Sequence, residues 1–247
     1  MKTLNFFFIL NLIFCTSAFS QDAKEIIKRV DEKIRGNSSK ANMTIEIVRP
    51  KWTREMTLTS WSKGDDYSIT LINSPARDKG TVFLKRDKEI WNWVPSIDRN
   101  IKLPPSMMMQ SWMGTDFTND DLVKQSSIVT DYEHRYLKDS TIEGYSCYVI
   151  ELIPKPDAPV VWGQIKIWVD KKEYMQMRTE YYDEDEYLVN IMTGSMVKIF
   201  DGKKLPSRME MIPVEKKGQK TVIIYNELEF DIDIADNFFT TQNMKRL

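Results

Sequence analysis

Residues 90–122 read I-W-N-W-V-P-S-I-D-R-N-I-K-L-P-P-S-M-M-M-Q-S-W-M-G-T-D-F-T-N-D-D-L. Prolines and a glycine interrupt this run of tryptophan and methionine, so it cannot form one continuous helix or strand. Two short strands are expected before the prolines, at residues 90–94 and 101–103. Residues 106–113 are apolar at nearly every position, which predicts a segment that is buried on several sides or covers an apolar space.

The end of this stretch has the pattern of a helix start. Thr118 is placed to cap a short helix, with the carboxylate of Asp121 three residues later near the helix N-terminus. Methionine side chains are flexible and fit irregular apolar surfaces. A Met- and Trp-rich run at a strand-to-helix junction therefore favours a lid over an apolar cavity. Ordinary buried core is the alternative interpretation.

The N-terminus has the pattern of a secretory signal peptide. Lys2 supplies the positive charge, residues 4–14 form the apolar core, and Ala-Phe-Ser at residues 18–20 forms a small-x-small cleavage site. We expect cleavage after Ser20 and export to the periplasm. Cys15 follows Phe14, where a lipoprotein signal needs a small residue, and this argues against a lipid anchor. No later apolar run approaches the roughly 20 residues of a membrane-spanning helix.

The remaining sequence fits a single domain over residues 21–247. Cys147 is its only cysteine, so no internal disulfide can form and the core alone must hold the fold. The 35 lysines and arginines nearly balance 36 acidic residues, without a basic cluster. This distribution argues against nucleic acid as a partner. We expect a monomer.

Helical periodicity is confined to the start of this domain. Residues 22–35 carry one apolar stripe, with Asp22 as the expected cap and Gly36 as the stop. After Gly36 the apolar residues alternate with polar ones. This alternation predicts strands at residues 41–47, 52–58, 67–71, 81–84, 128–137, 146–153, 160–169, 174–182, 187–192, 196–200, 207–214 and 221–230.

Many evenly spaced strands after one leading helix indicate an α+β protein with a large antiparallel sheet. We expect a strongly curved, half-open sheet or barrel whose concave hydrophobic face is covered by the leading helix and residues 106–124. A closed membrane-spanning barrel would need an apolar outer band between aromatic girdles. Charged residues such as Lys166 instead occupy the strand face opposite the apolar rows.

The sequence contains few groups for catalysis. His134, the only histidine, alternates in phase with two tyrosines, which favours a position on a strand face over the role of a general base. No G-x-S-x-G, H-E-x-x-H or phosphate-binding glycine motif is present. The acidic run at residues 183–186 lacks the alternating pattern of a calcium loop and is expected at a solvated turn. Cys147 lies within an apolar strand. We expect no enzyme, no metal site and no cofactor.

Two blocks of sequence resemble the outer membrane lipoprotein-sorting protein family. They are S-P-A-R-D-K-G at residues 74–80 and G-T-D-F-T-N-D-D-L at residues 114–122. The resemblance implies a fold like that of the periplasmic lipoprotein carrier (LolA-like), a half-open antiparallel barrel with helices over a hydrophobic cavity. It also implies a transport chaperone that carries a lipid or lipoprotein acyl chains across the periplasm. An arginine that latches the lid is a further implication, and Arg54 is the candidate.

For such a carrier, the expected ligand contacts are apolar side chains. They are Trp91, Trp93, Met107, Met108, Met109, Trp112, Met113, Met175, Met177, Met209 and Met211. Burial of each methylene group of an acyl chain contributes about 0.8 kcal/mol to binding. A carrier must provide this burial and still release its cargo, which favours a pocket that can repack and a lid that can move. An inner-membrane transporter and an outer-membrane acceptor are possible partners. The alternatives are a sensor or adaptor of the same fold that binds a protein partner, and an enzyme that acts on a lipid ester through His134.

Overall fold

The computed structural model describes residues 17–124 and 127–247, and most of the expected signal peptide lies outside these residues. Helix α1 (Ser17–Arg35) opens the described chain. It begins before the predicted cap at Asp22, because no proline or glycine interrupts residues 17–22. The predicted stop at Gly36 is confirmed, since Gly36 has a left-handed φ of 63°. None of the helices in the described residues has the length and apolarity needed to cross a membrane.

All thirteen strands of the described chain belong to one antiparallel sheet, in the order β6-β5-β4-β3-β2-β1-β13-β12-β11-β10-β9-β8-β7. The strands are β1 (Ser38–Arg49), β2 (Trp52–Lys63), β3 (Tyr67–Ser74), β4 (Val82–Arg86), β5 (Glu89–Val94), β6 (Arg99–Lys102), β7 (Tyr132–Ile142), β8 (Tyr145–Pro154), β9 (Gln164–Asp170), β10 (Gln176–Tyr182), β11 (Leu188–Phe200), β12 (Lys203–Pro213) and β13 (Lys220–Phe230).

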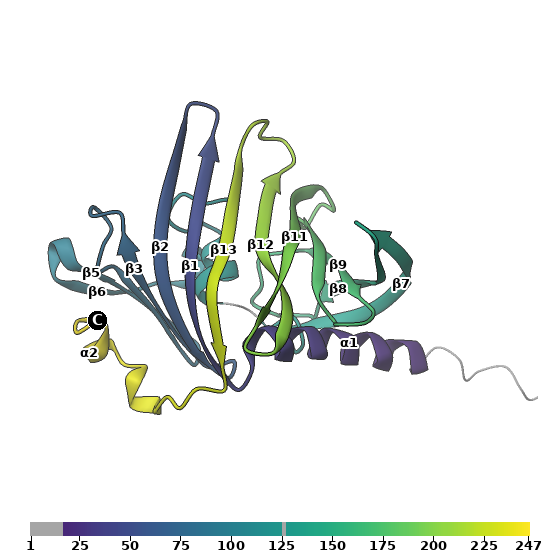
Figure 1. The fold of residues 1–247 in the computed structure, drawn as a ribbon, viewed down its shortest axis with the longest axis horizontal. Coiled ribbons are helices and arrows are strands. Elements are labelled where there is room, and N and C mark those ends of the chain that lie inside the picture. Colours follow the sequence, from purple (N-terminus) through teal and green to yellow (C-terminus); the bar gives the residue numbers. More distant parts are fainter. Residues whose placement is uncertain (1–16, 125–126) are drawn as a thin grey trace, which may run out of the picture.

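The sheet is strongly curved and open, as predicted. Figure 1 shows it bending from β5 and β6 on one side to β7 on the other, with α1 crossing below the β7 side. Its centre is the pair β1–β13, in which Ser39 lies opposite Phe230. Every other neighbouring pair in the sheet joins strands that follow each other in the chain. The sheet therefore consists of two meanders, β1–β6 and β7–β13, joined by the pairing of the first and last strands, and β6 and β7 are its open edges.

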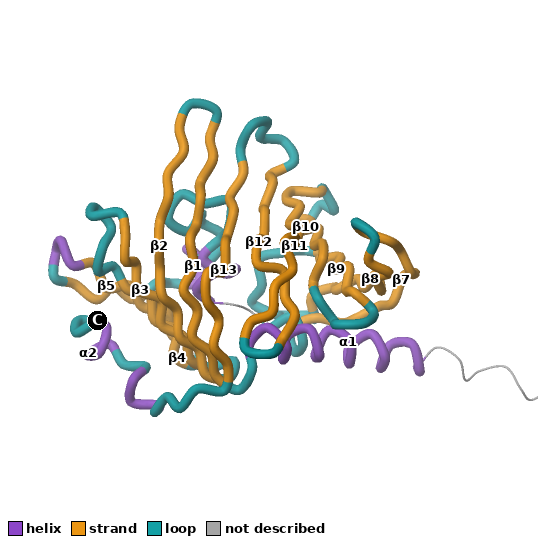
Figure 2. Tube along the Cα trace, in the orientation of Figure 1, coloured by secondary structure: helices purple, strands orange, loops and turns teal. Residues whose placement is uncertain are grey.

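Short irregular elements make up most of the remaining chain (Figure 2). The 3-10 turns are η1 (Pro95–Ile97), η2 (Pro105–Met107) and η4 (Asp236–Phe238). The π-helix η3 (Asp120–Lys124) follows Thr118, and helix α2 (Thr241–Met244) lies near the C-terminus. We call residues 105–124 the lid segment. It is largely loop because prolines precede it and Gly114 adopts a φ of 80°.

The main core lies on the concave face of the sheet, between the strands and the two elements predicted to cover it. Ile27 and Val30 of α1 are fully buried there, beside Trp112 and Phe117 of the lid segment. They pack with strand residues such as Ile167. The prediction that the leading helix and the lid segment cover this face is therefore confirmed.

The opposite face of the β3–β5 region carries a second core. Trp93 packs there with Phe239 and Met244 from the C-terminal segment, and Trp91 lies beside them. Because successive strand residues face opposite sides, Ile90 lies in the main core while Trp91 does not. Trp91 and Trp93 therefore lie on the same face of β5, but this is the face opposite the main core.

Strand boundaries differ from the prediction most at β11, β9 and β7, and β7 covers residues 132–142 instead of 128–137 because a turn occupies residues 128–130. The predicted strands 187–192 and 196–200 are one strand, β11, because Gly194 does not make a turn. A Cβ at Gly194 would lie 2.8 Å from the carbonyl oxygen of Gln176 and 2.9 Å from Pro206 Cγ, so this glycine permits close strand packing. Strand β9 begins at Gln164 rather than at residue 160, after a proline-containing loop.

Candidate functional site

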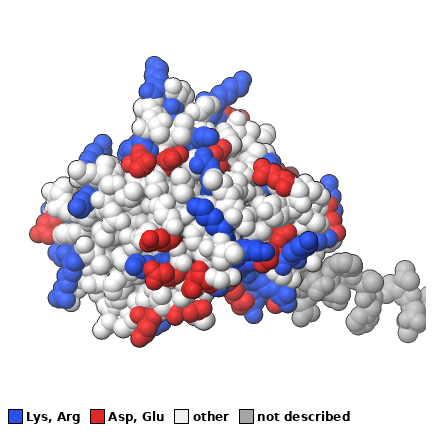
Figure 3. Space-filling view, in the orientation of Figure 1, with Lys and Arg blue, Asp and Glu red and all other residues white. Residues whose placement is uncertain are grey.

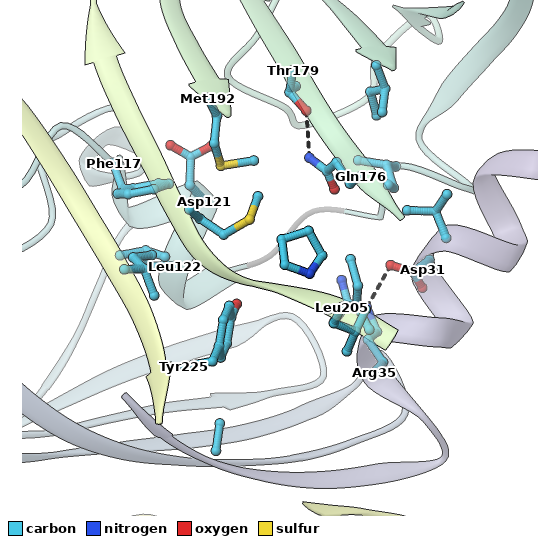
Figure 4. A pocket seen from close by; sticks show the side chains of 18 of the residues that line it. Asp31, Arg35, Phe117, Asp121, Leu122, Gln176, Thr179, Met192, Leu205 and Tyr225 are labelled. Carbon is cyan, nitrogen blue, oxygen red and sulfur yellow. Dashed lines mark hydrogen bonds and ion pairs between the residues drawn. The ribbon is translucent and has the colours of Figure 1, made fainter. Parts of the chain in front are cut away.

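A cavity of about 330 Å³ lies between the concave face of the sheet, the C-terminal half of α1 and the lid segment. Figure 4 shows side chains from these three parts of the chain converging on it. Most of its walls are apolar. The strand side chains that form them include Met43, Ile165, Ile167, Met192, Leu205, Met209, Ile223 and Leu228.

Two pairs of polar side chains are among the residues that line the cavity. On α1, Arg35 Nε donates to Asp31 Oδ1 at 2.8 Å. On β10, Gln176 Nε2 donates to Thr179 Oγ1 at 2.6 Å, and both pairs are drawn in Figure 4. Within each pair the two side chains satisfy each other's hydrogen-bonding groups. The apolar walls are therefore the main surface available to a ligand.

Asp121, which is labelled in Figure 4, is one of two acidic residues of the lid segment that line the cavity, and the other is Asp120. Asp121 Oδ2 accepts from the backbone N–H and the hydroxyl of Thr118, at 2.7 and 2.8 Å. The Asp121 N–H donates to Thr118 Oγ1 at 3.1 Å, which confirms the predicted cap. Oδ1 accepts from Trp162 Nε1 at 2.9 Å. Desolvation raises the pKa of Asp121, while these hydrogen bonds oppose the rise.

Trp162 is held over the cavity by this bond and packs against Tyr181, with ring centroids 5.0 Å apart. Sequence reasoning placed Trp162 in a predicted strand at residues 160–169 and did not connect it with the cavity, whereas it lies in the loop before β9. It also missed Tyr181 and Tyr225, which line the cavity from β10 and β13. Strand phase places each tyrosine on one face of its strand but does not say which face lines the cavity.

The turn at residues 113–116 fastens the lid segment to the strands. Arg49 of β1 donates to the Gly114 carbonyl at 2.8 Å and pairs with the Asp116 carboxylate at 3.0 Å. Thr221 Oγ1 of β13 donates to Asp116 Oδ2 at 2.7 Å. Arg54 of β2 donates to the Met113 carbonyl. The arginine singled out from the sequence thus reaches the lid segment, beside a second arginine that sequence reasoning missed.

The structure does not bring the eleven predicted ligand contacts to one place. Met209 lines the cavity. Met107, Met108, Trp112, Met113 and Met211 belong to or pack against the main core without lining it, and Met109 is 71 % exposed. Met175 and Met177 form a separate cluster with Cys147, and Trp91 and Trp93 lie under the C-terminal segment. Apolar side chains lie on both faces of this sheet, so strand phase could not say which face holds the cavity.

The remaining reactive side chains have structural positions. Cys147 is fully buried, and this burial raises the pKa of its thiol to about 11. Residues 183–186 form the β10–β11 turn, where Asp183 accepts from the N–H groups of Asp185 and Tyr187. Across residues 17–124 and 127–247, no three His, Cys, Asp or Glu side chains are grouped to hold a metal ion.

His134 is buried on β7, and its Nε2 lies 2.7 Å from the Ile128 carbonyl, to which it donates. Burial lowers the pKa of His134. A group whose pKa is lower in the folded protein than in the unfolded chain stabilises the fold at pH values above its pKa in the unfolded chain. This contribution is lost as the pH falls through the pKa of the group in the folded protein.

We therefore expect His134→Gln, which retains a donor but cannot titrate, to weaken the loss of stability between neutral and mildly acidic pH. The measurement is urea unfolding of both proteins at about pH 7 and about pH 5, on either side of the ordinary histidine pKa. Identical pH dependence in the two proteins would contradict this account of His134.

Comparisons with known proteins give one family and one fold. Residues 64–246 match a family model whose description reads "-like: Uncharacterized protein". No curated protein matches the chain. A DUF1329 family protein from Desulfovibrio piger has a similar structure, with a TM-score of 0.83 and 22% identity over 92% of this chain and 99% of that one.

Two further structures agree with that fold. A putative outer membrane lipoprotein-sorting protein domain from Vibrio parahaemolyticus gives a TM-score of 0.82, with 22% identity over 92% of this chain and 100% of that one. A LolA superfamily protein from Nitrosomonas europaea gives 0.77, with 24% identity over 90% and 98%. The fold implied by the sequence resemblance is confirmed.

Proposed function

Because this chain belongs to the family whose model spans residues 64–246 and has the fold of the LolA superfamily and of outer membrane lipoprotein-sorting domains, we propose that it carries a lipid or lipoprotein acyl chains in its cavity. The observation that supports this most is the position of the cavity, between an apolar sheet face and a lid segment held to the strands by side chains. We propose that residues 1–20 direct export to the periplasm, with cleavage after Ser20.

The cavity has the chemistry that an acyl chain needs. Most of its walls are apolar, and two pairs of the polar side chains that line it are hydrogen-bonded within each pair. At about 330 Å³ it lies at the lower end of the range for ligand pockets, about 300–1,000 Å³. A larger lipid would need the lid segment to move outward. Four methionines at or near this face, Met43, Met113, Met192 and Met209, allow such repacking because their side chains are unbranched.

The direct test is native mass spectrometry of the protein purified from membrane-containing cells. We expect a lipid adduct that organic extraction removes and that rebinds when a fatty acid is added back. Absence of any lipid from every preparation would overturn the proposal and favour the adaptor alternative. An inner-membrane donor and an outer-membrane acceptor are part of the same proposal, and transfer of the extracted lipid between two vesicle populations would test them.

A pair of matched substitutions locates the binding site. Met209→Asp places a carboxylate in the cavity wall, whereas Met109→Asp places it on an exposed position of the lid segment. Unpaired charge against apolar surface is strongly unfavourable, so we expect Met209→Asp to weaken binding of a fluorescent fatty acid by at least about tenfold. Met109→Asp should bind as the wild type does.

Circular dichroism controls for folding in both variants. Equal affinities for the probe in two folded variants would place the ligand outside this cavity. Loss of binding in Met109→Asp alone would place it on the outer surface of the lid segment.

A further inference from the structure

Two neighbouring hairpin tips project from the sheet beyond the other loops (Figure 1). One tip is the turn at residues 50–51 between β1 and β2, together with Trp52 at the start of β2, and the other is the turn at residues 214–219 between β12 and β13. They lie side by side because β1 pairs with β13. A Cβ placed on Gly218 would lie 3.7 Å from Pro50 Cγ.

Both tips expose apolar side chains among lysines. The exposed fraction is 51 % for Trp52 and 44 % for Val214. Lys51, Lys216 and Lys217 are also exposed, against one exposed acid in these turns, Glu215. In Figure 3 the basic side chains at the top of the molecule lie over these two tips. The rest of this face mixes both signs of charge.

We propose that the two hairpin tips form a docking surface for an anionic lipid bilayer. Tryptophan favours the boundary between hydrocarbon and water, because one part of its ring system is apolar and its N–H needs a polar partner. Lysines beside it are attracted to anionic head groups. Here the guanidinium of Arg49, which is paired with Asp116, lies 5.9 Å from the Trp52 ring centroid and supports the ring, so the exposed charge at the tips comes from the lysines.

A bilayer fits these tips better than a protein partner does. A specific protein interface usually buries about 800 Å² on each partner, with a packed apolar centre. The tips are narrow and convex, and their apolar side chains are separated by charged ones. Two loops that place single apolar side chains at one level, with lysines around them, are suited to shallow insertion into the head-group region.

The docking surface is next to the fastening of the lid segment. Trp52 lies opposite Arg49 in the β1–β2 register, and Arg49 holds Gly114 and Asp116. Arg54, two residues after Trp52, holds Met113. A protein docked through its tips would therefore present the fastened turn of the lid segment towards the bilayer. This inference concerns membrane contact and does not depend on what the cavity holds.

The test is co-sedimentation of the purified protein with vesicles of phosphatidylcholine alone, or with about 30% phosphatidylglycerol, whose surface charge attracts lysines. We expect binding to the anionic vesicles only, and its loss in about 0.5 M salt, where the Debye length is only a few ångströms. A surface lysine contributes about fivefold to such binding, so Lys51→Glu/Lys216→Glu/Lys217→Glu should reduce it on the order of a hundredfold.

The matched control is Lys88→Glu/Lys138→Glu/Lys172→Glu, which makes the same change in net charge at exposed positions away from the tips. It should retain most of the binding. Trp52→Ala should weaken binding more than Ile97→Ala, which removes another half-exposed apolar side chain. Absence of wild-type binding to anionic vesicles, or equal loss in the two triple variants, would overturn the proposal. Capture of an acidic protein by the tips without vesicle binding would also overturn it.

Discussion

Asp116→Ala is expected to lower the free energy of unfolding by about 3–5 kcal/mol, the usual effect of breaking a buried ion pair. The side chains of Asp116 and Arg49 are only 4 % and 12 % exposed, so the remaining guanidinium would stay buried without its counter-charge. The substitution also removes the acceptor of the Thr221 hydroxyl. Because Asp116 lies in the turn that fastens the lid segment, amide hydrogens of residues 111–118 should exchange faster in this variant.

Asp98→Ala is the matched control for this prediction. Asp98 also pairs with a cation, Lys245, but its side chain is 84 % exposed, so water replaces the lost contact. Guanidinium unfolding measures both variants, and Arg49→Ala/Asp116→Ala should lose less than the sum of the single changes if the two groups interact. An Asp116→Ala protein as stable as Asp98→Ala would mean that the ion pair does not hold the turn.

Trp112→Ala should also destabilise the fold by about 3–5 kcal/mol, as expected for removal of a large buried aromatic side chain. Trp112 is 2 % exposed and packs against Phe83 of β4, with ring centroids 5.4 Å apart. Within the described residues its Nε1 has no hydrogen-bond partner. Trp112→Phe keeps most of the packing and removes an unsatisfied donor, so it should be much less destabilising.

Met109→Ala is the control within the same segment, and its effect should stay within about 0.5 kcal/mol because the side chain is mostly exposed. Thermal unfolding followed by circular dichroism compares the three variants. Equal, small effects of Trp112→Ala and Met109→Ala would show that the lid segment contributes little to the core. The large difference expected here would mean that Trp112 fastens the lid segment to the main core.

The sequence was most informative where local chemistry decides the structure. Glycine-containing turns such as Asp201-Gly202 and Lys217-Gly218 separate strands as expected. Thr118 and Asp121 form the predicted cap, since a capping box needs only residues three apart. The leading helix followed from periodicity, and the curved sheet with a covered concave face was expected from the many strands and the apolar stretch. The family resemblance implied the same half-open fold.

The candidate site was less predictable, because it depends on which face of the sheet is concave. The prediction that Trp91 and Trp93 lie on the same face of their strand is correct. That face is the convex one, however, and the C-terminal segment covers both side chains there. Met175 and Met177 likewise pack with Cys147. Arg49 looked like an ordinary charged residue at a strand end, and its partner Asp116 is far away in the sequence. Such contacts appear only once the strands are placed.

The central strand pair has a consequence for the order of folding. β1 and β13 contribute opposite ends of the chain to the middle of the sheet, with Ser39 opposite Phe230. The two meanders can form from local hairpins, but they cannot join until the last strand has been synthesised. Long-range pairing of this kind slows folding. Under the export proposed above for this chain, that delay would keep the polypeptide without its central strand pair, and therefore able to pass through a translocation channel, until its synthesis is nearly complete.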